Sequence, residues 1–167
     1  MSNSPTPWSN ALYRIKRGLS GYVSYLAACD MNPSFSEYIL YEPTLRILTA
    51  QGFRVKCEAP CPGLPRKARG DVKKLDFVAD GNGTRFAIEM KWARTKRPRV
   101  VGDIEKLRCF RNSADGGLAF LCVFGRKSSL ASLALPDARL REQGEPVYAE
   151  FGVTKYGCRV YEVMDET

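Results

Sequence analysis

A chain of 167 residues, 44% of them hydrophobic, is long enough to bury one core, so we expect a single domain over residues 1–167. The formal net charge of +8 favours a polyanionic partner, nucleic acid ahead of a membrane surface. The sequence contains no histidine, which excludes histidine-dependent catalytic triads, histidine-based ribonuclease chemistry and two-cysteine two-histidine zinc fingers.

The amino-terminal segment and the cysteines indicate the cellular compartment of the protein. Residues 1–10 are polar and include prolines, unlike a secretory signal, and no long apolar run follows. We therefore expect a cytoplasmic protein with no membrane partner. The scattered cysteines suit buried, reduced thiols, although Cys57 and Cys61 could hold half a zinc site if Cys109 and Cys122 supplied the rest.

Two helical regions are expected first in the chain. Residues 1–30 predict a peripheral cap of two short helices, near 9–17 and 22–28, separated by Gly18 and Gly21. The glycines lower helix propensity, and this is why a break is placed there.

The second helical region spans about residues 36–51, with Ser36 as a good N-cap residue. Pro43 lies inside it, which predicts a kink or a start later than Ser36. Glu37 falls within the apolar stripe of this helix, whereas Glu42 points away from it. An acid in an apolar stripe is a candidate functional residue, so Glu37 is preferred and Glu42 is the alternative.

Three strands are expected next. Residues 53–58 alternate in polarity, and residues 74–80 and 85–91 predict a β-hairpin. The turn contains Asn82 and Gly83, which both accept the positive φ angles of a type I′ turn. A two-residue turn of this type determines which residues of the two strands face one another.

In that register Asp76 lies directly opposite Glu89. Strand alternation places Lys91, Val78 and Ala87 on the same face as these two acids. The other face is expected to pack into a core and contains Leu75, Phe77, Ala79, Phe86, Ile88, Met90 and Trp92. Two facing carboxylates repel one another, and a divalent cation bound between them would offset this repulsion.

The remaining elements alternate between helix and strand. Residues 102–110 predict a helix, and residues 117–124 are almost continuously apolar, as is typical of a strand covered on both faces. Residues 128–135 predict a further helix. A C-terminal β-hairpin is expected over residues 147–164, with its first strand at 147–153.

This order of elements resembles the PD-(D/E)xK nuclease superfamily over about residues 36–124. Asp76 matches the metal-binding aspartate of that family, Glu89-Met90-Lys91 matches its (D/E)xK element, and Glu37 matches the glutamate that many members carry in the first core helix. Leu75 stands where the motif has proline, a position that varies widely in the family. The resemblance implies an α/β, restriction-endonuclease-like fold: an αβββαβ core whose mixed central sheet is flanked by helices, with N-terminal helices and a C-terminal β-hairpin added.

The resemblance also implies an activity, the metal-dependent hydrolysis of phosphodiester bonds by an endonuclease, with DNA favoured over RNA. Mg²⁺, with Mn²⁺ as a substitute, would be bound by Asp76, Glu89 and Glu37. The metal would acidify a bound water and polarise the phosphate, while Lys91 would orient that water or neutralise the developing negative charge.

Other assignments of the acids stay open at this point. Asp71 and Asp80 are alternatives to Asp76, and a solvated, purely structural hairpin face is the rival interpretation of the motif. Glu58 and Asp103 are expected to be surface residues.

Basic residues gather before the first hairpin strand and after the second, so antiparallel pairing brings both groups to the end that holds Asp76 and Glu89. Such clusters bind phosphate backbones largely without reading sequence, although solubilising loop charges look the same in a sequence. Tyr41 and Trp92 could stack on bases, with core packing favoured for Trp92. The candidate nucleic-acid-binding residues are Arg66, Lys67, Arg69, Lys73, Lys74, Arg94, Lys96, Arg97, Arg99 and Lys106.

The leading hypothesis is a small metal-dependent nuclease. The alternatives are a catalytically inactive nucleic-acid-binding or interaction module that keeps the nuclease fold, and a protein-interaction domain of a larger complex. Cutting both strands of a duplex needs two active sites, which a homodimer or a larger nuclease complex would provide.

Overall fold

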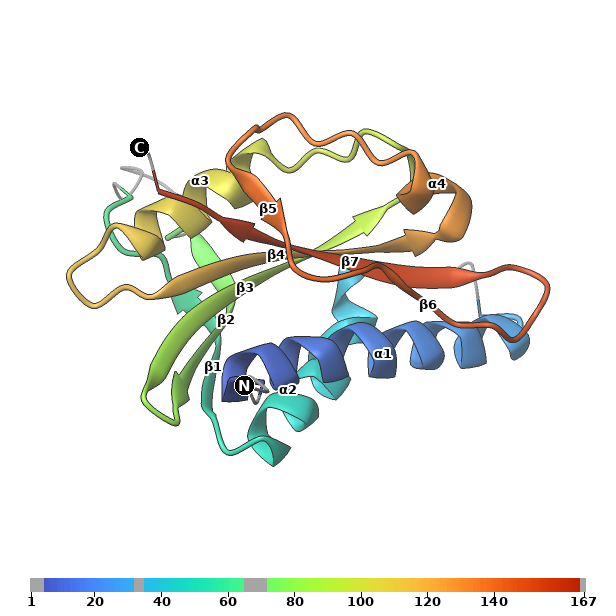
Figure 1. Cartoon of the computed structure of the whole chain (residues 1–167), viewed down its shortest axis with the longest axis horizontal. Helices are drawn as coiled ribbons and strands as arrows, with labels where there is room; N and C mark the ends of the chain where they lie inside the picture. Colours follow the sequence, from blue (N-terminus) through green and yellow to red (C-terminus); the bar gives the residue numbers. More distant parts are fainter. Residues whose placement is uncertain (1–4, 32–34, 65–71, 166–167) are drawn as a thin grey trace.

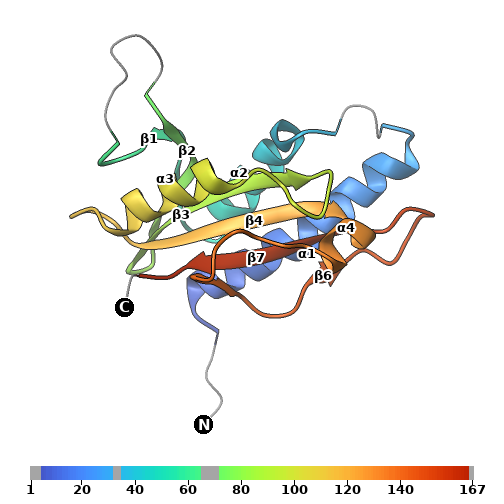
Figure 2. The ribbon, with the colours of Figure 1, turned by 90° about the horizontal axis from the view of Figure 1, so that it is seen from above.

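The computed structural model describes residues 5–31, 35–64 and 72–165. The protein is mixed α/β, with a seven-stranded, mostly antiparallel sheet between two layers of helices (Figure 1). Within the described chain, β3 and β4 form the one parallel pair, and Figure 2 shows them side by side with β7. The order across the sheet is β1 (Arg54–Pro60), β2 (Lys74–Gly81), β3 (Thr84–Ala93), β4 (Leu118–Arg126), β7 (Tyr156–Val163) and β5 (Leu140–Glu142), with β6 (Val147–Tyr148) also paired to β7.

Helices cover both faces of this sheet. One face packs against α1 (Pro7–Ala28), the 3₁₀ helix η2 (Glu37–Leu40) and α2 (Tyr41–Ala50), and the other against α3 (Val101–Arg111) and α4 (Lys127–Ala131), as Figure 1 shows. From η2 to β4 the elements follow the expected order of helix, three strands, helix and strand. In the part of the chain that the structure describes, no helix combines the length and apolar character needed to span a membrane.

Strand β4 separates the two halves of the core, as the continuous apolar run predicts. Phe120, Cys122 and Phe124 pack on the α1 side, while Leu121 and Val123 pack on the α3 side. This division also separates the cysteines that were considered for a zinc site, because Cys61 lies in the α3-side core and Cys122 in the α1-side core. All six cysteines are free thiols.

The N-terminal segment is one helix of 22 residues, so the prediction of a peripheral cap of two short helices is wrong. Ala11, Ile15, Leu19 and Val23 recur every four residues, are almost fully buried, and belong to the core that packs on the sheet. An interior glycine costs a helix about 1 kcal/mol. Burial of this apolar stripe outweighs that cost, because most helical stability in proteins comes from packing.

The second helical region begins as the short η2 and becomes α-helical at Tyr41, which confirms the predicted later start. Pro43 then lies in the first turn of α2, where its missing N–H would have no partner within the helix. Ser36 is extended but makes no side-chain capping bond in the described structure. Helix α4 is shorter than expected, since it ends at Ala131.

The C-terminal hairpin prediction is only partly right. Strand β7 does pair with β6, but its other edge pairs with β4, so β7 is an inner strand of the main sheet and no peripheral addition. The predicted first strand shrinks to Val147–Tyr148, and β5, which was not predicted, pairs with β7 further along. Gly144, with a φ of 65°, lies in the bend that separates β5 from β6.

Candidate metal-binding and catalytic site

The hairpin turn forms as its sequence predicts. Asn82 and Gly83 have φ angles of 53° and 71°, which are the positive values of a type I′ turn. The pairs run from Gly81 opposite Thr84 to Phe77 opposite Ile88, which confirms the predicted register. Asp76 and Glu89 come directly after the last of these pairs.

At this end of the hairpin, side chains replace the backbone ladder. The N–H of Asp76 donates to Glu89 Oε1 at 3.2 Å, and the N–H of Met90 donates to Asp76 Oδ2 at 2.7 Å. Each carboxylate is therefore attached to the backbone of the opposite strand. This reciprocal pair holds both acids in place where β2 and β3 part.

The alternation of β2 breaks at the same point. Leu75 packs in the α3-side core together with Val78, while Phe77 packs on the α1 side, so the predicted face of Leu75 is wrong. The described pairing of β1 with β2 skips Asp76 and its neighbour Glu58, whose φ is 48°. A local distortion of this kind re-aims a side chain, here the carboxylate of Asp76.

Tyr41 of α2 positions Asp76. Its hydroxyl donates to Asp76 Oδ1, and its ring packs against Phe77 with 5.0 Å between centroids. Burial and the neighbouring Asp76 carboxylate raise the pKa of Tyr41, so the hydroxyl stays protonated and able to donate. The sequence suggested base stacking for Tyr41, but its contacts are those of a positioning residue.

Glu89 is the most buried acid of the site, with 1% of its surface exposed. Lys106 of α3 approaches it closely, with 2.5 Å between Nζ and Oε2. Burial and then the charge of Asp76 raise the pKa of Glu89 to about 8, against the opposing effect of Lys106. Burial also raises the pKa of Asp76, although bonds from Tyr41 and Met90 oppose the shift.

Lys91 lies between two further acids. Its Nζ is 2.9 Å from Asp103 Oδ2 and 3.2 Å from Glu37 Oε1, which also accepts from the N–H of Trp92 at 3.2 Å. Burial lowers the pKa of Lys91, but Asp103 and Glu37 outweigh it and the net pKa is raised. The ammonium group therefore remains charged at neutral pH.

Asp103 joins the two lysines, and its prediction as a surface residue is wrong. Its side chain is 16% exposed, and its other oxygen lies 3.6 Å from Lys106 Nζ. Asp103 and Lys106 lie one turn apart on α3. Their spacing was visible in the sequence, but only the packing of α3 against β2 and β3 shows which lysines Asp103 reaches.

Together these residues form what we call the charged cluster, which contains Glu37, Tyr41, Asp76, Glu89, Lys91, Asp103 and Lys106. Its four carboxylates and two lysines sum to a charge of −2 when all are ionised (−4 + 2), in a protein whose net charge is +8. A local excess of negative charge favours a bound cation.

The alternative acids lie elsewhere. Glu42 pairs with Arg46 on the surface, and Asp80 lies near the hairpin turn, where it approaches Arg54. Glu58 is exposed and pairs with Lys74, as expected of a surface residue. The structure thus brings Glu37 to the cluster and leaves Glu42 outside it.

The basic candidates divide into three groups. Lys106 belongs to the charged cluster, and Lys73 and Lys74 form ion pairs with Glu105 and Glu58. The loop after β3 exposes its four basic side chains to solvent. These are Arg94, Lys96, Arg97 and Arg99. Four further candidates lie outside the described residues: Asp71 among the acids, and the basic Arg66, Lys67 and Arg69.

The fit of a metal rests on Asp76 and Glu89. Among the described residues, no three cysteine or acidic side chains converge to hold a metal ion. Mg²⁺, however, is commonly bound by only one or two carboxylates, together with waters and substrate phosphate oxygens. The Asp76–Glu89 pair matches that donor set. Glu37 is directed at Lys91 and the backbone of Trp92, so its role as a third ligand stays a prediction.

The fold and the charged cluster define a mixed α/β protein with a carboxylate–lysine site at the open end of a β-hairpin. Comparison of the chain with protein-family models, with curated proteins and with solved structures finds no match. What the molecule does is therefore inferred from the charged cluster itself.

Proposed function

We propose that this protein is a metal-dependent nuclease of the PD-(D/E)xK type, built on a restriction-endonuclease-like core, that hydrolyses phosphodiester bonds in DNA in preference to RNA. The observation that carries the proposal is the reciprocal attachment of Asp76 and Glu89 to opposite hairpin strands, with Lys106 on Glu89 and Lys91 joined to Lys106 through Asp103. If the hairpin face were merely solvated, Glu89 would be exposed to water, but it is buried.

Asp76 and Glu89 are the metal ligands in this proposal. Mg²⁺ or Mn²⁺, when bound, supplies an acidified water and a polarised phosphate. Tyr41 keeps one oxygen of Asp76 oriented, and the N–H of Met90 holds the other. The site is thus preorganised by groups that do not themselves take part in the reaction.

The two lysines supply positive charge where phosphate charge develops. Asp103 and Glu37 keep Lys91 protonated, so Lys91 can donate a hydrogen bond to a phosphate oxygen. Lys106 contacts Glu89 Oε2, an oxygen that would also be available to a metal. The ammonium group of Lys106 also donates to the backbone carbonyl of Lys74 at 3.0 Å, and this bond would hold Lys106 in place if Glu89 turned toward a metal.

A second candidate function is favoured by the same Lys106 contact. If Lys106 neutralises Glu89 permanently, the cluster is an internal ion-pair network and the protein is a catalytically inactive nucleic-acid-binding module on a nuclease fold. That protein would bind nucleic acid in a salt-sensitive way, without turnover, and its binding would be indifferent to chelators.

The test is cleavage of plasmid, linear duplex and single-stranded DNA with Mg²⁺ or Mn²⁺. Asp76→Asn and Lys91→Ala should each lower the rate at least about 100-fold, since each removes a group that binds the metal or the transition state. Asp80→Asn is the matched control, because it removes a charge from the same strand at the turn end of the hairpin.

Two results would contradict the nuclease proposal. One is the absence of cleavage by the wild type with either metal on every substrate. The other is an Asp76→Asn variant that cleaves as fast as Asp80→Asn. Chelator-indifferent DNA binding in the first case would establish the inactive module instead.

A further inference from the structure

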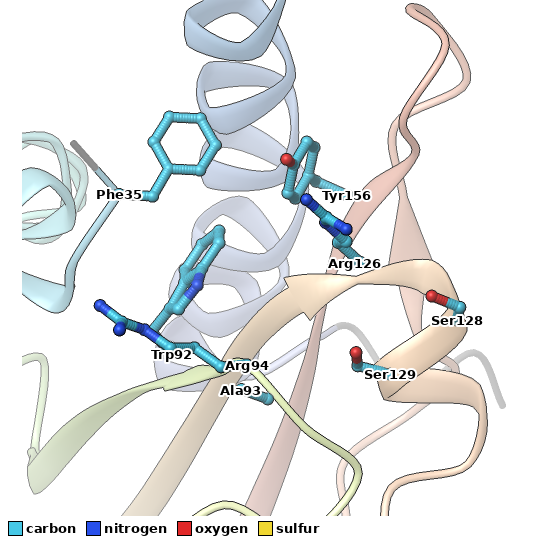
Figure 3. Close-up of a pocket in the computed structure, with 8 residues that line it drawn as sticks. All are labelled: Phe35, Trp92, Ala93, Arg94, Arg126, Ser128, Ser129 and Tyr156. Atoms are coloured by element: carbon cyan, nitrogen blue, oxygen red, sulfur yellow. The ribbon is translucent and has the colours of Figure 1, made fainter. Parts of the chain in front are cut away.

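A pocket of about 430 Å³ opens at the C-terminal ends of β3 and β4 (Figure 3). The rings of Phe35, Trp92 and Tyr156 line it, and Phe35 lies 5.3 Å from Trp92 and 5.4 Å from Tyr156 between centroids. Phe35 and Tyr156 are buried, whereas Trp92 remains partly exposed. The Trp92 ring also lies 5.9 Å from the Tyr156 ring and packs against the core, so its partly exposed side is the surface on which a flat ligand can stack.

Two arginines make the same pocket positive. Arg94 and Arg126 both line it and are exposed, and within the described chain neither forms an ion pair. Many other arginines of this protein are paired with acids, among them Arg111 and Arg159. An unbalanced pair of guanidinium groups is complementary to phosphate, which arginine binds with several N–H donors.

The pocket shares its chain segments with the charged cluster. Trp92 follows Lys91 directly on β3, and its N–H donates to Glu37 Oε1 at 3.2 Å. Phe35 lies two residues before Glu37. The pocket is therefore joined to Glu37 and Lys91 of the charged cluster through neighbouring residues and one backbone hydrogen bond.

We propose that this pocket binds one unpaired base of a nucleic acid strand, stacked on Trp92, with the flanking phosphates held by Arg94 and Arg126. Base stacking on aromatic side chains tolerates any sequence, and a base can enter a pocket only when it is outside a duplex. The volume lies within the range of ligand pockets, roughly 300–1,000 Å³. The substrate class is then single-stranded nucleic acid or an unpaired end, a specification that rests on the proposed nuclease function.

The binding test uses tryptophan fluorescence in EDTA, so that no metal-dependent cleavage takes part. The chain has two tryptophans, and Trp8 is stacked on Phe120 at 5.4 Å, so a Trp8→Phe variant leaves Trp92 as the single reporter. A short oligothymidylate should quench this fluorescence. An abasic strand of equal length and a fully paired duplex should not.

A second measurement tests the arginines with a labelled oligothymidylate. The double variant Arg94→Ala/Arg126→Ala should weaken binding at least about tenfold, since each arginine makes charge-assisted bonds to phosphate. Arg46→Ala/Arg54→Ala is the matched control, because it removes the same charge from two highly exposed arginines outside the pocket. If Trp8→Phe does not fold, the loss of quenching on Trp92→Phe in the otherwise native protein gives the same information.

Equal quenching by the abasic strand or by the duplex would overturn the proposal, as would equal weakening by both double variants. The quenching experiment and the cleavage experiment test the two proposals separately. Base-dependent quenching without any cleavage in Mg²⁺ would retain the pocket and reject the nuclease, and cleavage without such quenching would do the reverse.

Discussion

Replacement of Glu89 by Gln should change how the stability of the metal-free protein depends on pH. Burial and the charge of Asp76 raise the pKa of Glu89 from 4.5 to about 8 in the folded state. The folded protein therefore binds more protons than the unfolded chain between these values. The free energy of unfolding of the wild type must then fall as the pH rises through this window.

The magnitude follows from the same shift. One pKa unit corresponds to about 1.4 kcal/mol, so the Glu89 carboxylate can destabilise the folded state by up to about 4 kcal/mol between pH 5 and pH 8. Glutamine cannot ionise, and the stability of Glu89→Gln should lack this decline. The free energy of unfolding of the variant, relative to that of the wild type, should therefore increase steadily from pH 5 to pH 8.

The assay is urea unfolding in EDTA at pH 5, 6, 7 and 8, followed by circular dichroism. The chain has no histidine, and the cysteine thiols that begin to ionise near pH 8 are the same in the wild type and in Glu89→Gln. Glu58→Gln is the control, because Glu58 is exposed and paired only with Lys74 among the described residues. Saturating Mg²⁺ at pH 8 should stabilise the wild type and leave Glu89→Gln unchanged.

Parallel pH profiles for Glu89→Gln and the wild type would refute the reasoning. They would mean that Lys106 keeps Glu89 ionised across the whole window. The reciprocal pair with Asp76 would then be a neutralised structural contact and a poor basis for a metal site.

Three further predictions concern packing and binding. Phe86→Ala should lower the free energy of unfolding by about 3–5 kcal/mol, because Phe86 is fully buried against Phe53 and Phe120, as chemical denaturation will measure. Glu162→Gln should cost about 3 kcal/mol in the same assay, since this buried acid accepts bonds from two arginines and a glutamine; exposed Glu150→Gln should cost less than about 0.5 kcal/mol. Replacing two exposed cations of the loop after β3 by alanine should reduce the slope of log affinity for DNA against log salt concentration by roughly 1.5, whereas an unchanged slope would show that the loop does not contact phosphates.

The parts of the fold that could be predicted from the sequence are those set by local chemistry. The turn at Asn82-Gly83 requires positive φ at both residues, and from this alone the register of the hairpin and the juxtaposition of Asp76 and Glu89 follow. The apolar run of β4 likewise predicted a strand buried on both faces. In both cases the signal lies within a few neighbouring residues.

The parts that failed depend on contacts between distant segments. Gly18 and Gly21 weaken a helix locally, but packing on the sheet holds α1 continuous. Asp103 looked like a surface residue because nothing in its own surroundings in the sequence places Lys91 beside it. Leu75 was assigned to the wrong face because ideal alternation cannot foresee the distortion at Asp76.

The two edges of the sheet have a consequence for self-association. Strand β1 is distorted at Glu58, whose backbone is left-handed, and ends at Pro60. The opposite edge is split between the short strands β5 and β6. Irregular, charged or broken edges resist pairing with another chain. A second copy, if two sites are needed to cut a duplex, should therefore dock through helices or loops, and concentrated protein should resist growth into fibrils by edge-to-edge addition.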